Sequence, residues 1–180
     1  MDANTRHIGC SASQRTVGGR TYSAEVLEMA ATWKDTTRRL TVYPASGQTG
    51  VPTTFNRCQE HPTPFGGPCD TAHPVQNVGY VVTLQADGYY ALKIQGIGFS
   101  RGSSGSPVAI HRAVRSRTTK STVAASSVDT NLPANAAMLA ATAPLAPKTK
   151  YSVRVSGYVQ ATKGATWVQF KTRTWSFTTA

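Results

Sequence analysis

The sequence predicts an all-β protein built as an antiparallel β-sandwich. The chain has 180 residues, which is enough for one domain with an appendage. Thr, Ser, Ala and Val are abundant, and 15 Gly and 10 Pro punctuate the chain, as many short strands joined by turns require. Seven or eight segments with strand-like patterns follow one another without a repeating period, which favours a sandwich over a parallel sheet or a solenoid.

We expect a short N-terminal extension, residues 1–37, before a sandwich that spans residues 38–180. Residues 1–20 contain several glycines and serines and no apolar run, so an irregular segment is predicted there. Residues 22–34 place Val26, Met29 and Trp33 on one helical stripe, which predicts a short helix. The alternative is that the extension is the remnant of a preceding domain and that this segment is one of its strands.

The sandwich is predicted to begin with a strand at 39–43, which ends at Pro44 and is followed by a turn. Residues 78–84 and 89–95 flank the dipeptide Asp87-Gly88, a strong hairpin signal, so we expect these two segments to pair. Further strands are predicted at 107–112, 136–139, 150–157 and 174–178.

Strict alternation in the last two strands predicts which side chains enter the core. Tyr151, Val153 and Val155 share one face, and Trp175 shares a face with Phe177. We expect Trp175 and Phe177 to point inward. The alternative use of the aromatic C-terminal region, which also holds Trp167 and Phe170, is a platform for stacking carbohydrate.

Four segments resemble a known family. The segment at 43–52, YPASGQTGVP, is similar to the YPADGQTGVP entry of bacterial immunoglobulin-like domains, including those attached to bacterial proteins of the cysteine-rich secretory protein superfamily. The segments LPAN at 132–135, APLAP at 143–147 and WSFTT at 175–179 resemble the end of the same domains. Together the similar segments bracket residues 40–179.

This resemblance implies an immunoglobulin-like β-sandwich that is secreted, periplasmic or on the cell surface of a bacterium. It implies a non-catalytic accessory or interaction module of a cell-envelope protein, joined to other domains, with no catalytic residue and no cofactor. Its exposed loops would make it a plausible surface antigen. The chain departs from the family pattern in the middle, where a cysteine-bounded loop and a long basic connection occur.

In an exported protein, Cys58 and Cys69 are expected to form a disulfide around a loop rich in Pro and Gly. Two alternatives remain open: a zinc site that combines both cysteines with His61 and His73, or free thiols. Cys10 is then the odd cysteine and is expected to be reactive, either as an unpaired thiol or as a cysteine that has lost its partner.

One motif is typical of a hydrolase. Residues 102–108, GSSGSPV, are similar to the nucleophile loop of chymotrypsin-like proteases, with Ser104 as nucleophile, His73 as base and Asp87 between them in sequence. Only 31 residues (104 minus 73) separate serine and histidine, too few to place them in separate barrels. A Gly/Ser turn between strands explains the motif, and we expect no enzyme activity and no metal.

The charge of the chain is unevenly distributed. The net charge is +11, of which residues 101–180 carry +10, with Asp129 as their single acidic residue. A possible polyanion patch is Arg112, Arg115, Arg117 and Lys120. The second hypothesis is therefore a module that binds an anionic glycan or lipopolysaccharide through its basic C-terminal half.

Other partners are not expected. Aromatic residues do not interleave with the basic patch, so sequence-specific nucleic-acid binding is not predicted. No apolar run is long enough to span a membrane, and we expect a monomer.

Overall fold

The computed structural model describes residues 7–17, 20–30, 37–59, 65, 69, 72, 75–102, 105–114, 127–128 and 132–180. For 7–17, 20–30, 59, 112–114 and 127–128 it describes the backbone alone. The chain divides into two units, Met1–Thr37 and Arg38–Ala180, which are described separately.

The N-terminal unit contains an antiparallel pair of strands, β1 (His7–Val17) and β2 (Arg20–Ala30). The pairing runs from Val17 opposite Arg20 to His7 opposite Ala30. The predictions of an irregular lead-in before residue 20 and of a helix within 22–34 are therefore wrong for these strands. Helix propensity is a weak preference that pairing with a partner strand overrides, and the Gly-Gly dipeptide at 18–19 is a hairpin signal.

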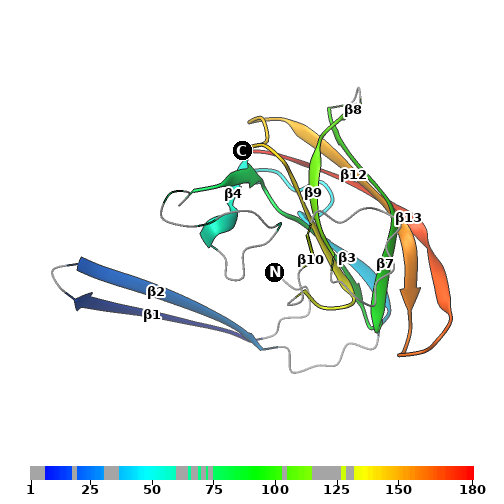
Figure 1. Cartoon of the computed structure of the whole chain (residues 1–180), viewed down its shortest axis with the longest axis horizontal. Coiled ribbons are helices and arrows are strands. Elements are labelled where there is room, and N and C mark those ends of the chain that lie inside the picture. Colours follow the sequence, from blue (N-terminus) through cyan, green and yellow to red (C-terminus); the bar gives the residue numbers. More distant parts are fainter. Residues whose placement is uncertain are drawn as a thin grey trace. The chain divides into compact units, whose positions relative to one another are not determined.

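The second unit is a sandwich of two sheets, which confirms the predicted all-β class (Figure 1). One sheet has the order β10 (Ser127–Val128), β9 (Ile110–Val114), β11 (Ala136–Ala141), β6 (Val82–Asp87) and β3 (Arg39–Tyr43). The other has the order β13 (Trp167–Thr178), β12 (Lys150–Gln160), β7 (Ala91–Arg101) and β8 (Ser106–Pro107). All neighbours within these two sheets are antiparallel except β9 and β10.

The predicted hairpin around Asp87-Gly88 is wrong. β6 pairs with β3 and β11 in one sheet, whereas β7 pairs with β12 and β8 in the other. The turn itself forms, with Gly88 at φ +70° and the amide of Tyr89 donating to the carbonyl of Ala86 at 3.2 Å. It carries the chain from one sheet to the other, and each strand pairs with two strands of its own sheet. The single strand predicted at 107–112 likewise changes sheet, between β8 and β9.

The core lies between the sheets and contains the side chains that alternation placed there. Trp175 and Phe177 are 3% and 1% exposed, opposite Val153 and Tyr151 of β12, as predicted. Phe99 lies with its ring centroid 5.5 Å from that of Tyr151. Further core side chains come from the connecting segments, Val51 and Leu145, and from both sheets, among them Val82, Leu84, Leu92, Ile94, Leu139, Val155 and Val159.

The first and the last of the four segments that carry the family resemblance, 43–52 and 175–179, lie against each other at one edge of the sandwich. The amide of Gly47 donates to the carbonyl of Ser176 at 2.7 Å, and that of Val51 donates to Thr178 at 3.1 Å. Val51 also forms a parallel bridge with Thr179. Residues 45–51 therefore cover the last part of the edge strand β13.

Candidate binding site

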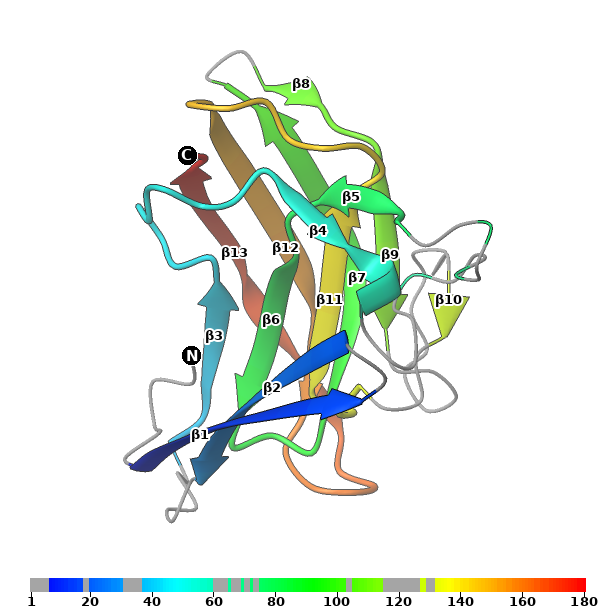
Figure 2. The same cartoon turned by 90° about the vertical axis from the view of Figure 1, so that its left-hand side faces the viewer.

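An additional layer lies on the outer face of the five-stranded sheet (Figure 2). It contains β4 (Thr54–Asn56), the 3-10 turn η1 (Arg57–Gln59) and β5 (Asn77–Gly79), with β4 and β5 paired antiparallel. Phe65, in the cysteine-bounded loop, is buried with Val78 against Ala140 of β11. Sequence patterns did not identify Phe65, because the Pro/Gly loop around it has no periodicity.

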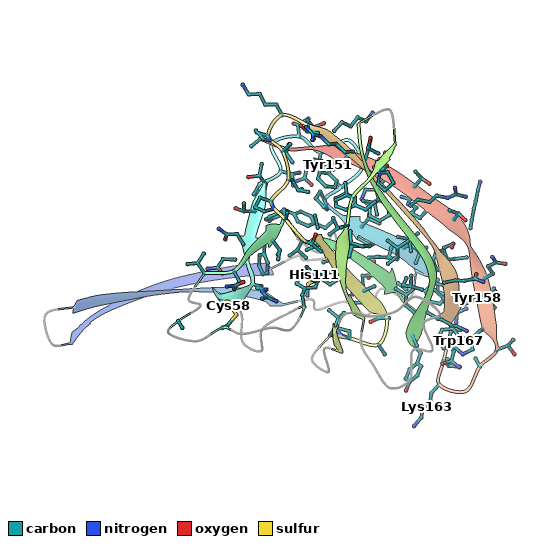
Figure 3. The ribbon with its side chains drawn as sticks, turned by 45° about the horizontal axis from the view of Figure 1, so that its top comes forward. Cys58, His111, Tyr151, Tyr158, Lys163 and Trp167 are labelled. Carbon is teal, nitrogen blue, oxygen red and sulfur yellow. A yellow bond between two sulfur atoms is a disulfide. The ribbon has the colours of Figure 1, made fainter. Side chains whose placement is uncertain are left out.

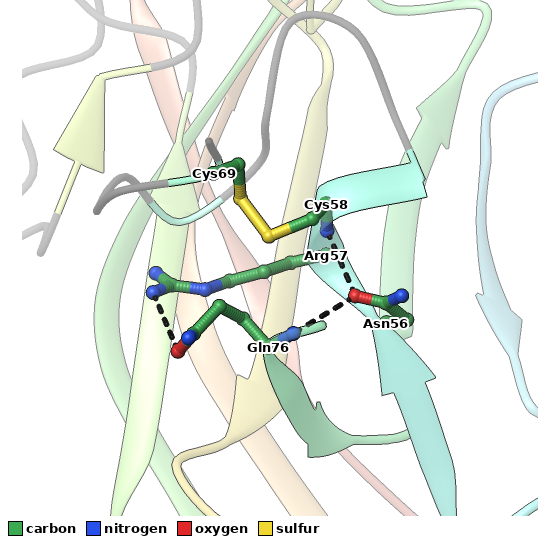
Figure 4. Close-up of a disulfide and its surroundings, with 5 residues drawn as sticks. All are labelled: Asn56, Arg57, Cys58, Cys69 and Gln76. Atoms are coloured by element: carbon green, nitrogen blue, oxygen red, sulfur yellow. Dashed lines mark hydrogen bonds between the residues drawn. A yellow bond between two sulfur atoms is a disulfide. The ribbon is translucent and has the colours of Figure 1, made fainter. Parts of the chain in front are cut away.

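Cys58 and Cys69 are joined by a disulfide in this layer, as predicted (Figure 4). The side-chain oxygen of Asn56 accepts hydrogen bonds from the amides of Cys58 at 3.1 Å and Gln76 at 3.0 Å. The zinc alternative is wrong, because both sulfurs are used in the bond; His61 and His73 lie outside the described residues. In the described part of the chain, no three His, Cys, Asp or Glu side chains gather as metal ligands.

His111 of β9 lies beneath the disulfide layer, with its ring centroid 6.1 Å from that of Phe65. Burial lowers the pKa of His111 below the usual 6.5, and the charge of Arg57 lowers it further. The guanidinium of Arg57 donates to the side-chain oxygen of Gln76 at 3.4 Å. The imidazole is therefore neutral in the folded protein at neutral pH.

We predict that His111 couples the stability of this layer to pH. The unfolded chain binds a proton at a pKa near 6.5, and the folded chain only at a lower pH, so protonation favours unfolding. The free energy of unfolding should thus fall as the pH drops below 6.5 and be unaffected by this group above that pH. An NMR titration of the imidazole should give a midpoint below 6.5, and His111→Gln should remove this part of the acid sensitivity. A midpoint at or above 6.5 would contradict the prediction.

The protease-like segment joins β7 to β8, with Ser100 opposite Pro107 and Arg101 opposite Ser106. Asp87 lies just before the other end of β7, and the ten-residue rise of that strand separates the two ends by about 33 Å. Asp87 instead accepts hydrogen bonds from Thr41 and, at 3.4 Å, from Nε of Arg39. Ser104 and His73 lie outside the described residues. The placement of Asp87 gives no support to a triad.

The side chains of the predicted basic patch lie outside the described part of the chain. Arg112 lies in β9 opposite Leu139, and its side chain is outside the described part of the chain. Arg115, Arg117 and Lys120 are also outside it.

The described surface of the sandwich is nonetheless strongly basic. Among the described residues of 38–180, Asp87 is the sole acidic side chain, and it is 8% exposed. Exposed cationic side chains come from several elements: Arg38, Arg101, Lys148, Lys150, Arg154, Lys163, Lys171 and Arg173.

Four basic side chains line one groove, which has a volume of about 730 Å³ and lies where the edge strands β3 and β13 approach each other. Arg38 and Arg39 come from the β3 side, and Lys171 and Arg173 from β13. The other lining residues are Leu40, Tyr89, Val159, Phe170, Thr172 and Thr174. Sequence patterns did not identify this site, because its two walls are about 130 residues apart in sequence.

A signal for the groove did exist in the sequence. Arg173 is in phase with Trp175 and Phe177, so alternation places an arginine on the core-facing side of a strand. The structure pairs Arg173 with the buried Val155, yet the arginine is exposed, because the seam between the sheets is open at this point.

The outer face of the four-stranded sheet carries two of the aromatic residues. Tyr158 and Trp167 are half-buried, and Nζ of Lys93 lies 5.5 Å from the centroid of the Tyr158 ring (Figure 3). Phe170, by contrast, packs against the core. The two rings of this face flank Gln160 and Gln169, which are their partners across β12 and β13.

Comparison with protein-family models and with curated proteins finds no match for this chain. Within the residues that the structure describes, no helix has the length and apolar character needed to cross a membrane.

Proposed function

We propose that residues 38–180 form an immunoglobulin-like domain that serves as a non-catalytic interaction module of an exported bacterial envelope protein. The strand order carries this proposal. The series β3, β6, β11, β9 and the series β8, β7, β12, β13 have the connectivity of strands A, B, E, D and C′, C, F, G of an immunoglobulin-like sandwich.

A hydrogen bond supports the same assignment. The hydroxyl of Tyr151, near the start of β12, accepts from the amide of Ala146, five residues upstream, at 2.9 Å. Immunoglobulin-like sandwiches have such a tyrosine corner at the start of strand F. The domain departs from antibody domains in its disulfide, which braces the outer layer at Cys58 and Cys69 instead of joining the two sheets.

Export is supported by that disulfide, because such bonds persist in oxidising compartments. A secreted, periplasmic or cell-surface location follows from the proposal, as does recognition of exposed loops by host antibodies. The likeness of 43–52 and 175–179 to domains attached to the cysteine-rich secretory protein superfamily makes the N-terminal unit the end of a neighbouring domain in this proposal.

The test is cosedimentation of the oxidised protein with bacterial cell envelopes, compared with heat-unfolded protein. Saturable binding by the folded protein alone is expected, and Ser104→Ala should bind equally well. Turnover of peptide or ester substrates that is lost in Ser104→Ala would overturn the non-catalytic assignment.

A second candidate function, binding of a polyanion, is favoured by one observation. The sole acidic side chain in the described part of the sandwich is buried beside Arg39, so no exposed carboxylate among these residues opposes the basic surface. Such a surface attracts anionic polymers and raises their rate of association.

A further inference from the structure

We propose that the groove between β3 and β13 binds a polyanionic polysaccharide chain. This proposal rests on the polyanion-binding function proposed above and names its site and ligand class. The groove lies wholly within the sandwich unit, and its volume of about 730 Å³ is within the range of ordinary ligand sites.

Cations flank the groove on both sides. Arg39 is the first residue of β3, an edge strand of the five-stranded sheet, and Arg38 precedes it. Lys171 and Arg173 lie on β13, an edge strand of the other sheet. A ligand with anionic groups along its length can contact both walls at once. Cations on both walls therefore favour a ligand that carries several anionic groups, such as an anionic polymer.

The local charge balance is positive. Asp87 lies beside Arg39 and also accepts a hydrogen bond from Thr41, so its charge is held within the fold. The groove lining includes no acidic side chain, whereas Arg38, Lys171 and Arg173 are all exposed in it. These cations are therefore placed to contact sulfate, carboxylate or phosphate groups.

The aromatic residues of the groove favour a polysaccharide over a nucleic acid. Binding of single strands depends on aromatic faces on which bases stack. The guanidinium of Arg38 already lies 5.7 Å from the centroid of the Tyr89 ring, and Phe170 packs against the core. The groove therefore recognises charge and offers little base stacking.

Edge protection explains only part of the arrangement. An inward charge such as Arg173, together with the irregular pairing of β13 near 171–172, prevents edge-to-edge association of sheets. Protection of the β13 edge requires no cation on the β3 side of the groove. Arg38, placed over Tyr89 just before β3, makes the groove two-sided.

The experiment measures binding of a size-fractionated heparin oligosaccharide to the full chain over a series of salt concentrations. The variant is Lys171→Gln/Arg173→Gln. The matched control is Lys150→Gln/Arg101→Gln, which removes one lysine and one arginine from exposed positions outside the groove. Each lost ion contact should lower the magnitude of the log–log salt slope by about 1.

At about 0.1 M salt we expect the groove variant to bind at least about tenfold more weakly and the control less than about threefold. Arg38→Gln, on the opposite wall, should also weaken binding, and all variants should keep the wild-type melting temperature. Equal losses of heparin affinity in the two double variants would overturn the groove assignment but would still support polyanion binding by the domain. Absence of heparin binding by the wild type would overturn both. An oligothymidylate of equal charge that binds as tightly and depends equally on the groove would overturn the choice of polysaccharide.

Discussion

Trp175→Ala is expected to destabilise the sandwich by about 3 to 5 kcal/mol, the cost of removing a large aromatic side chain from a core. Trp175 is 3% exposed and lies opposite Val153, so the cavity would open in the layer shared by β12 and β13. This is a large share of the 5 to 15 kcal/mol that typically stabilises a domain. Denaturant unfolding of the purified variant, or its loss from the soluble fraction, measures the effect.

Trp175→Phe is the matched variant. Nε1 of Trp175 is buried and has no hydrogen-bond partner among the described residues, so phenylalanine would remove a polar group together with part of the ring. We expect a smaller decrease in the free energy of unfolding for Trp175→Phe than for Trp175→Ala. Trp167→Ala, on the outer face, should change stability least. A melting temperature of Trp175→Ala within a few degrees of the wild type would contradict the core assignment.

Removal of the disulfide by Cys58→Ser/Cys69→Ser is expected to cost about 3 kcal/mol, since the bridge closes a short loop and restricts the unfolded chain. The loss should be concentrated in the outer layer, where Phe65 packs on Ala140. Amide exchange of β4 and β5 should therefore accelerate more than that of β12. Urea unfolding measures the total loss of stability, and amide hydrogen exchange shows whether that loss is concentrated in the outer layer.

Cys10→Ser is the control and should leave stability unchanged. Thiol labelling of the unreduced, denatured wild type should modify Cys10 alone. Labelling of Cys58 or Cys69 in addition would show that the bridge does not form in the isolated protein.

Local patterns predicted much of the sandwich because alternation reports which face of a strand is buried. This holds for β12 and β13, where Val153, Trp175 and Phe177 lie in the core as expected. It fails for β1, where an irregular segment was predicted, and for β2, whose residues also fit a helical stripe. A short apolar pattern does not say whether a partner strand exists, and pairing decided the outcome.

The sequence pattern likewise did not predict which strands pair with each other. The Asp87-Gly88 turn was predicted correctly, yet β6 and β7 enter different sheets, because a tight turn constrains the local backbone and not the pairing on either side. The candidate site, too, depends on contacts between segments that are distant in sequence. The patch at 112–120 was inferred from neighbours in sequence, whereas the groove assembles cations that only the approach of β3 and β13 brings together.

The sequence by itself therefore determined the β class, the inward faces of the last strands and the excess of positive charge, and it favoured the Cys58–Cys69 bridge over two open alternatives. These properties depend on composition, on the two-residue period of a strand and on the closeness of two cysteines along the chain. Only the tertiary structure decided the sheet order, the outer layer over His111 and the two-walled groove. Each of these depends on contacts between segments distant in sequence, and such contacts are selected by how all the strands pack at once.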